Sequence, residues 1–374
     1  MKRLGRRKFV QGAAAGTAAA AVAFPYVARG AKPYDGQVLS VFSYAGAFES
    51  TVRDHLVARF EESTGARVKL DVGWWDMLPK LKASPPGQPV YDAVITDPTQ
   101  GFPSIKEGLF EKFDPANIPN AKLNHGPMQE NWVQKDNWGV NLSGSMMVMA
   151  FNTEVSSAVP SHWHQLLDPA LEGKLSFYNA LYMSLYTFAQ MKAGLEGRPG
   201  EGRAELEKDF DGVLKFCAEH RDVVRVWWTS SGDFVGKLLQ KEISGGVCHS
   251  SAAFPAEDDG KPVKSVIPDE GTANVHLFWA IPAGTKVKRL AEEWINETFS
   301  TAFQTKWGAV GKIPVTNLEA APLAAKENAF YGRFLPTSKE DWDKVAFYPY
   351  DVYFDGDNWE RANDFWDREV LRKS

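Results

Sequence analysis

The side chains that most often act in catalysis are spread along this chain without a recognisable arrangement. The sequence contains no GxSxG, HExxH or GxGxxG motif and no phosphate-binding loop. No Ser-His-Asp set can be assembled from its scattered histidines, which include His55, His125, His220, His249 and His276. We therefore predict that the protein is not an enzyme and has no catalytic residues, and we keep a secreted enzyme as the rival hypothesis of another class.

The sequence gives little indication of metal or thiol chemistry. His162 and His164 are two residues apart at a predicted helix start, where we expect their side chains to diverge, so no metal site and no cofactor is predicted. Cys217 and Cys248 are the two cysteines, and there is no CxxC motif. An oxidising compartment would permit a disulfide between them, and two buried thiols are the alternative that we favour.

Neutral hydrogen-bonding groups gather where predicted strands end and helices start. They are Ser143, Ser145, Thr229, Ser230, Ser231, Ser250 and Ser251. Such groups can bind a polar solute without transforming it. A helix start at Ser230 could hold an anion, although the nearby Asp233 works against this.

These groups must be positioned by strands and helices, which alternate along the chain. Strands are predicted at 38–43, 66–72, 91–96, 140–152, 175–178, 223–228, 246–249, 263–267 and 278–282. Helices are predicted at 48–63, 77–81, 102–107, 163–167, 180–191, 204–220 and 291–303, with one more opening at 229–233. Gly65 is expected to end the first helix in a left-handed conformation. The alternation indicates an α/β fold with mainly parallel sheets flanked by helices.

The first thirty residues are typical of an export signal rather than of a folded element. Arg6 and Arg7, followed by Phe9 and a weak Ala-rich apolar run at 12–24, resemble the twin-arginine signal. Cleavage is expected near Arg29, with 21–23 as an alternative. This resemblance implies a protein that is exported folded, loses its signal and works outside the cytoplasm. An ordinary secretory leader is the alternative.

Removal of this segment makes the protein more acidic. Residues 1–30 carry six basic side chains and no acidic one, so the formal charge of -5 becomes -11. An acidic surface argues against nucleic acid and anionic membranes as partners. The apolar run is well short of the ~20 residues that a spanning helix needs.

Several segments, in order, resemble the solute-binding proteins of ABC importers. The segments are 60–65 (FEESTG), 91–95 (YDAVI), 107–114 (EGLFEKFD), 161–169 (SHWHQLLDP) with Gly173 and Lys174, 268–271 (PDEG) and 281–284 (IPAG). Each motif is weak alone, and their order and spacing carry the resemblance. Within this family the pattern is most similar to the spermidine/putrescine-binding proteins.

The resemblance implies a two-lobed periplasmic binding protein of type II. The first lobe would comprise 33–142 and 278–325, and the second 143–277 and 326–374. A small solute would bind between the lobes and be delivered to an ABC permease in the inner membrane. The protein would act as a periplasmic monomer.

The resemblance also implies which positions contact the solute. These are Tyr44, Asp97, Ser143, Tyr178, Asn179, Ser230, His249, Ser250, Asn274 and His276. Tyr44 stands where polyamine binders carry an aromatic residue. The alternatives are that Tyr44 covers the core and that Asp97 forms a turn with Pro98.

Departures from the polyamine pattern leave the solute open. Where the polyamine binders carry a pair of acidic residues, this chain has Asn179, Ala180 and Met183, and where they carry a later acid it has Leu277. Asp76, Asp97 or Asp233 could substitute for them, and Trp74, Trp75 and Trp228 could supply cation–π faces. A neutral, zwitterionic or anionic solute, or ferric iron, remains an alternative to an amine. Tyr348, Tyr350 and Tyr353 are expected to pack against the second lobe rather than bind iron.

Overall fold

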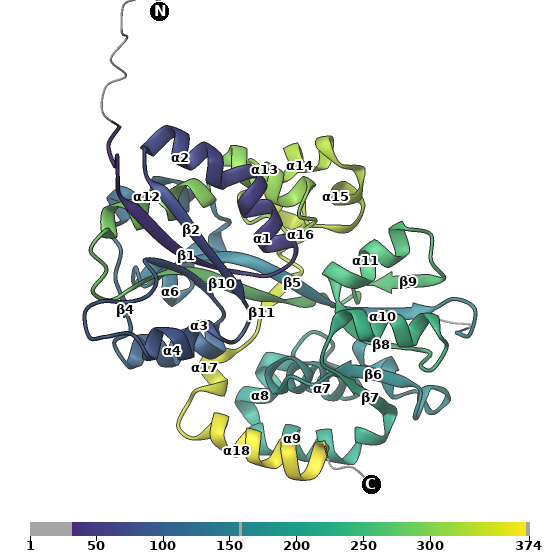
Figure 1. Cartoon of the computed structure of the whole chain (residues 1–374). Helices are drawn as coiled ribbons and strands as arrows, with labels where there is room; N and C mark the ends of the chain where they lie inside the picture. Colours follow the sequence, from purple (N-terminus) through teal and green to yellow (C-terminus); the bar gives the residue numbers. More distant parts are fainter. Residues whose placement is uncertain (1–31, 157–158, 372–374) are drawn as a thin grey trace, which may run out of the picture.

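The computed structural model describes residues 32–156 and 159–371, which form two lobes joined by long strands (Figure 1). Each lobe has a β-sheet flanked by helices, so the predicted α/β fold class is confirmed. The predicted export signal at 1–30 lies outside the described residues. Within those residues, no helix combines the length and apolar composition that crossing a membrane requires.

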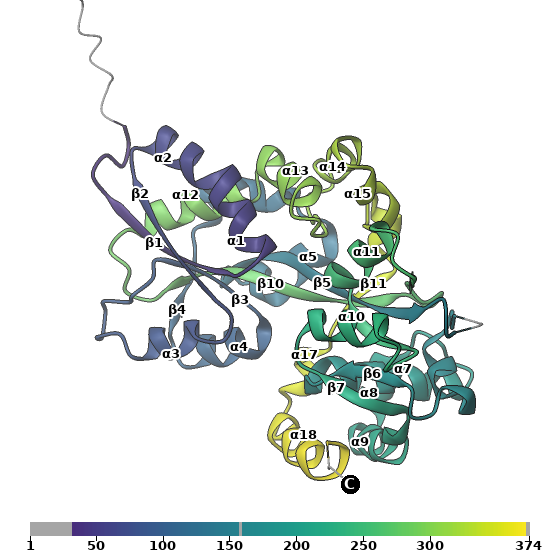
Figure 2. The same cartoon turned by 45° about the vertical axis from the view of Figure 1, so that its right-hand side comes forward.

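Three parallel strands form the centre of the first lobe. β1 (Val38–Tyr44) lies between β2 (Arg67–Gly73) and β3 (Ala93–Thr96). The apolar side chains of β1 from Leu39 onwards and those of β3 are buried because helices cover both faces of the sheet. The helices on one side are α1 (Ala47–Val52), α2 (Ala58–Thr64), α12 (Lys288–Thr298) and α13 (Thr301–Ala309), and those on the other are α3 (Met77–Lys82) and α4 (Pro98–Lys106) (Figures 1 and 2). Gly65 ends α2 with φ of 81°, as predicted.

Two long antiparallel strands belong to both lobes. β5 (Gly139–Asn152) pairs with β10 (Thr272–Pro282) in its first half. Its second half pairs with β8 (Gly245–His249) and β9 (Val263–Val266) of the second lobe. The end of β10 pairs with β3 and with the short β4 (Phe110–Glu111) of the first lobe. The sheets are therefore mixed, because β5 and β10 run antiparallel to each other and to β3, β4, β8 and β9, while β10 also pairs in parallel with β11 (Val345–Phe347).

The second lobe is centred on β6 (Leu175–Tyr178), which runs parallel to β7 (Val224–Trp228) and β8. Its helices are α7 (Leu181–Leu195), α8 (Gly202–Lys208), α9 (Phe210–Glu219), α10 (Ser231–Leu239) and α11 (Ser250–Asp258). Three of these helices begin within three residues of a strand end, after β6, β7 and β8. Short elements of the first lobe, α5 (Gly126–Glu130) and α6 (Trp132–Lys135), lead into β5.

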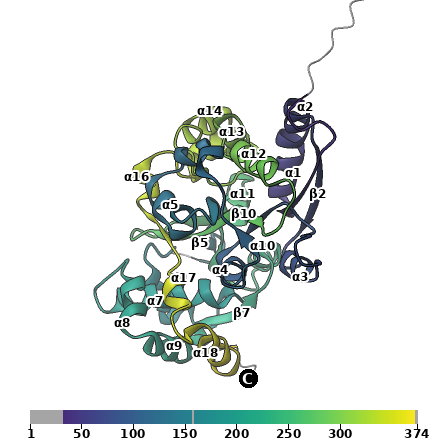
Figure 3. The ribbon, with the colours of Figure 1, turned by 90° about the vertical axis from the view of Figure 1, so that its left-hand side faces the viewer.

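The C-terminal segment runs from the first lobe to the second (Figures 1 and 3). Its elements are α14 (Ala321–Glu327), α15 (Ala329–Phe334), α16 (Lys339–Trp342), β11 (Val345–Phe347), α17 (Tyr350–Tyr353), α18 (Asn358–Phe365) and a helical turn at Trp366–Val370. The Trp342 indole N–H donates to the Val315 carbonyl at 3.2 Å, and the Tyr353 hydroxyl donates to the Tyr182 carbonyl at 2.7 Å. The lobe boundary at 325/326 stays a prediction, and we propose from these contacts that the last crossing lies at 343–349.

Several predicted elements have different limits in the structure. The helix predicted at 204–220 is divided, because the Asp209 carboxylate accepts the Gly212 backbone N–H at 2.9 Å and starts a new helix there. The helix predicted at 291–303 is likewise divided, by the cap that Ser300 forms on α13. The last crossover strand begins at Thr272 rather than Phe278, since its early residues pair with β5 and β11.

Both cysteines are free thiols, as we favoured. Cys217 lies in α9 and Cys248 in β8, and both are buried. Burial raises the pKa of each thiol, so these residues behave as small apolar core groups.

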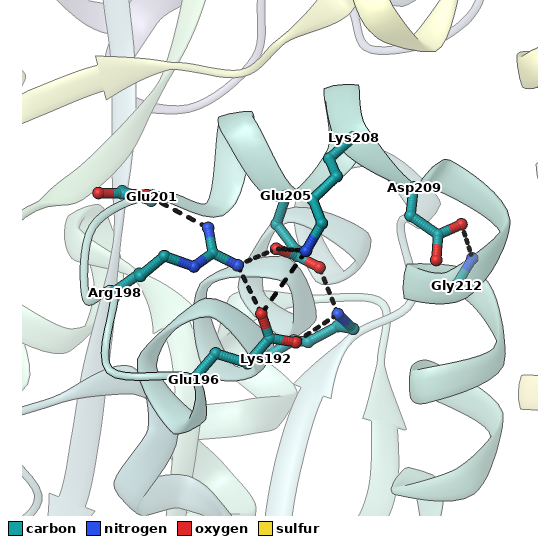
Figure 4. A network of polar contacts seen from close by, with 8 residues as sticks. All are labelled: Lys192, Glu196, Arg198, Glu201, Glu205, Lys208, Asp209 and Gly212. Atoms are coloured by element: carbon teal, nitrogen blue, oxygen red, sulfur yellow. Dashed lines mark hydrogen bonds and ion pairs between the residues drawn. The ribbon is translucent and has the colours of Figure 1, made fainter.

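A buried carboxylate fixes the connection between α7 and α8 (Figure 4). The Glu205 side chain is 0% exposed and forms close ion pairs with Lys192 and Arg198. Glu196 adds contacts to the same two cations at 2.7 and 2.6 Å. Loss of the central charge would leave both cations without their buried partner, which is the costly way to disrupt such a cluster.

We predict that Glu205→Gln lowers the free energy of unfolding by about 3 kcal/mol. The matched control is Glu207→Gln, because Glu207 pairs with Arg203 on an exposed part of the same helix and exposed pairs contribute about 0–1 kcal/mol. Chemical denaturation of both variants measures the difference. Equal losses for the two variants would show that the buried cluster adds no more to the free energy of unfolding than an exposed pair does.

Candidate binding site

The candidate site is built where strands pass directly into helices. Tyr44 ends β1, Asp97 follows β3, Tyr178 ends β6 and His249 ends β8. Because the carboxyl ends of parallel strands meet at one edge of a sheet, each lobe presents its residues together.

Asp97 is the most constrained polar residue of the first lobe. Its side chain caps α4 and is buried, with 5% of its surface exposed. One carboxylate oxygen accepts the Thr99 backbone N–H at 2.7 Å and the Thr99 hydroxyl. The other accepts the Tyr44 hydroxyl at 3.1 Å and the Gln100 amide at 3.4 Å. The turn-forming role that we considered for Asp97 is therefore present, as a helix cap, and it leaves the carboxylate beside a tyrosine.

An aromatic wall extends from Asp97 towards solvent. The Tyr44 ring is buried and stacks on Trp74, with ring centroids 5.2 Å apart and an interplanar angle of 20°. Trp74 is 52% exposed, and its backbone N–H is held by the Asp76 carboxylate at 3.1 Å. Burial, and then the charge of Asp97, raise the pKa of Tyr44 well above its ordinary value, so its hydroxyl stays a donor.

The second lobe contributes a second aromatic group. Tyr178 stacks on Trp228 at 4.1 Å, and the His249 ring meets both edge-on at 5.1 and 5.2 Å. The Ser231 hydroxyl lies 3.1 Å from His249 Nδ1. Burial lowers the pKa of His249 to about 4, so the imidazole is neutral at pH 7.

Asp97 lies close enough to the second lobe for its charge to act there. Burial is the main cause of the raised pKa of Tyr178, and the charge of Asp97 is the second. The pKa of Tyr182 is raised first by burial, then by Tyr350 and then by Asp97. Burial is also the main cause of the raised pKa of Tyr350, and the charge of Asp97 raises it further. The Tyr182 and Tyr350 rings are 5.5 Å apart, and Tyr350 also meets Phe102 of α4 at 5.7 Å. The first lobe, the second lobe and the C-terminal segment therefore meet beside the helix that Asp97 caps.

The predicted residues of the crossover strands lie in a buried layer beside this point. Ser143 donates to the Asn274 side-chain oxygen at 2.8 Å, while Asn274 Nδ2 has no partner. The His276 ring meets Phe347 and Tyr350 edge-on at 5.1 and 5.3 Å, and neither of its nitrogens has a partner. Burial lowers the pKa of His276 to about 3.

The remaining predicted residues fall into two groups. Asn179 and Ser230 are exposed at the starts of α7 and α10. Ser250 is buried and has a structural role, because its hydroxyl accepts the Met146 backbone N–H at 3.1 Å and contacts Ser145 at 3.0 Å, which ties α11 to β5. Direct contact of any of these residues with a solute stays a prediction.

Sequence reasoning missed Gln100, Tyr182 and Tyr350 as members of this site. Gln100 is one helical turn after Asp97, and Tyr182 lies in the first turn after β6, so both could have been inferred from strand ends. Tyr350 could not, because it is far away in the sequence. The expectation that the C-terminal tyrosines pack on the second lobe is confirmed by the contacts of Tyr353 and Tyr350 with Tyr182.

The structure also tests the chemistry of the rival hypotheses. The expectation that His162 and His164 diverge is wrong, since their rings stack at 5.5 Å because His162 precedes a tight 3-10 turn. In residues 32–156 and 159–371, no group of three or more potential ligands is placed to hold a metal ion. Ser231 and His249 form a Ser-His contact, but His249 Nε2 has no partner and its low pKa makes the ring a weak base.

Comparisons with known proteins agree with this architecture. A family model described as bacterial extracellular solute-binding protein matches residues 55–330. The spermidine/putrescine-binding periplasmic protein of Salmonella typhimurium is 22% identical over 299 residues, which cover 77% of this chain and 82% of that protein. The gamma-aminobutyric acid-binding protein of Pseudomonas aeruginosa is 25% identical over 307 residues, with the same coverages of 77% and 82%. The crystal structure of an ABC transporter protein from Clostridium perfringens shares the fold, with a TM-score of 0.73 and 20% identity over 89% of this chain and 99% of that one.

We predict that His276 contributes to a loss of stability in acid. Its pKa in the folded protein, about 3, is below the ordinary value of 6.5. Between these values the unfolded chain binds a proton that the folded chain does not, so stability falls as the pH falls, by about 1.4 kcal/mol per pH unit.

The variant His276→Phe keeps the edge-on aromatic contacts and removes the titrating group. Denaturation at pH 7.5, 6 and 5 should therefore show a shallower loss of stability for this variant than for the parent. An unchanged pH dependence would contradict the assignment of this proton to His276, and the value at pH 7.5 reports whether the variant folds.

Proposed function

Because the chain belongs to the bacterial extracellular solute-binding protein family, we propose that it captures a small organic solute between its lobes and delivers it to an ABC permease. The observation that carries this proposal is the meeting of both lobes and the C-terminal segment beside α4, the helix that Asp97 caps. Tyr350 of the C-terminal segment meets Phe102 of α4 at 5.7 Å and Tyr182 of the second lobe at 5.5 Å, and Tyr44 donates to Asp97.

The names of two relatives support a particular class of solute. One is named for binding spermidine and putrescine, and another for binding gamma-aminobutyric acid. All three compounds carry at least one ammonium group. A buried carboxylate beside aromatic rings suits such a group, through ionic hydrogen bonds and cation–π contacts.

The proposed mechanism is closure of the lobes around the solute. β5 continues from one sheet into the other, and β10 pairs with it on the way back to the first lobe, so the lobes would rotate about these strands. A solute that contacts both lobes binds the closed form better and shifts the population towards it. Such a cycle holds and releases the solute without changing it, which agrees with the incomplete Ser231–His249 pair.

The proposed place of action is the periplasm. The family is extracellular, and the relative from Salmonella typhimurium is named periplasmic. The paired arginines Arg6 and Arg7 suit export in the folded state. The acidic charge of the chain without residues 1–30 argues against nucleic acid and anionic membranes as partners. The proposed partners are therefore a permease and a small solute.

The first test is ligand-induced stabilisation of the protein without residues 1–30. A solute at ~100 times its dissociation constant should add about 2.7 kcal/mol of stability. A thermal-shift screen should cover polyamines, amino acids, organic anions and ferric chelates. The double variant Tyr44→Ala/His249→Ala should lose the shift given by the solute that emerges, because it removes one aromatic contact from each lobe.

The matched control is Tyr34→Ala/His55→Ala, which replaces the same residue types on partly exposed positions of the first lobe. Each shift is measured against the ligand-free form of the same variant, so a general loss of stability does not enter. A full shift in the Tyr44/His249 variant would place the solute elsewhere. Stabilisation by no class of solute would contradict the proposed function itself.

The export route has a separate test. Replacing Arg6 and Arg7 together by lysine preserves the charge of the segment but removes the paired guanidinium groups. We predict that the full-length variant stays in the cytoplasm of a host with twin-arginine machinery, while the parent reaches the periplasm. Cell fractionation measures this, and periplasmic delivery of the variant would favour an ordinary secretory leader.

A further inference from the structure

One of the three acidic residues considered for the site, Asp97, is free to neutralise a bound cation. Three acidic residues had been considered for this role. The Asp76 carboxylate pairs with Lys80 at 2.7 Å, and Asp233 faces Lys237 at 3.7 Å. Asp97 is more deeply buried than either and has no basic side chain within ion-pair distance in the described part of the chain. The two exposed acids already have partners, so Asp97 alone remains.

The hydrogen bonds of Asp97 also leave a place for a donor from a ligand. All of its donors are uncharged, and the bond from the Gln100 amide is long, at 3.4 Å. The Gln100 side-chain oxygen has no partner among the residues that the structure describes, although Gln100 is only 8% exposed. An ammonium group beside Asp97 could donate to the carboxylate and to this orphaned oxygen together, which would satisfy two buried acceptors.

The surroundings of this place are aromatic and uncharged. Tyr44 and Gln100 come from the first lobe, and Tyr178 and Tyr182 from the second. These rings can contact a cation through their faces, but they cannot compensate a second full charge. A buried cation without a carboxylate is strongly penalised.

We infer that the solute carries a single ammonium group, which binds at Asp97, and that the site selects against di- and polyamines. This inference rests on the proposed function and names the class of its solute. It separates this chain from its spermidine- and putrescine-binding relatives, because a second or third ammonium group would enter a site with no carboxylate left to receive it.

Three probes of equal chain length test the inference on the protein without residues 1–30. Butylamine carries one ammonium group, gamma-aminobutyrate carries one ammonium and one carboxylate group, and putrescine carries two ammonium groups. Calorimetric titration at constant ionic strength should show that at least one of the first two binds ten times more tightly than putrescine. Spermidine should bind no better than putrescine.

The variant Asp97→Asn assigns the binding to this residue. Asparagine caps a helix as well as aspartate does, so the variant should fold. It should weaken the binding of the preferred probe at least tenfold. Asp233→Asn is the control, because Asp233 lies at the start of α10 with a lysine partner, and it should change binding less than twofold.

Several outcomes would overturn the inference while leaving the proposed function in place. These are tighter binding of putrescine or spermidine than of both other probes, binding of an amine that survives Asp97→Asn, and binding of an organic anion with no amine bound. Absence of binding by every class of solute would instead contradict the proposed function.

Discussion

The whole structure depends on two strands that belong to both lobes. β5 and β10 lie side by side; β5 continues from the first-lobe sheet into that of the second lobe, and β10 returns the chain from the second lobe to the first-lobe sheet. Every residue of β10 is buried, so neither strand can shift without disturbing both cores. Their pairing is irregular between Asn274 and His276. Gly144 lies opposite this irregularity, where a Cβ atom would come within 2.5 Å of the Val275 carbonyl oxygen. The crossing therefore needs a glycine at this position.

Around this crossing, the distribution of charge is unusually simple. Asp97 is a buried carboxylate without a basic partner in the described residues, and the nearby histidines are neutral because burial lowers their pKa. The hydroxyl groups of four tyrosines lie within the field of that one carboxylate. A site of this kind discriminates by charge, since a buried charge is tolerated only with a partner. The aromatic rings would add selection by shape, because their faces can contact a cation or an apolar chain.

The C-terminal half adds further connections between the lobes. Figure 3 shows α17 between α4 and α7, where Tyr350 contacts a residue of each helix. On the other side of the crossover strands, Phe254 of α11 stacks on Phe334 of α15 at 4.9 Å, and Arg333 pairs with Glu257 at 3.3 Å (Figure 2). These side chains line an open depression of about 380 Å³. The proposed closure of the lobes would rearrange these contacts, so they would help to set the balance between open and closed forms.

The sequence alone determined the fold class, most of the strands and the family, because hydrophobic periodicity and short motifs are local properties of the chain. It also predicted that residues at strand ends form the site, since the topology of parallel sheets brings those ends together. Only the tertiary structure decided which acids are already paired with lysines, that the crossover strands run antiparallel, and that Tyr350 lies between Phe102 of α4 and Tyr182 of α7. These features depend on contacts between residues that are far apart in the chain. No local pattern encodes such contacts, because they arise only when both lobes and the C-terminal segment pack together.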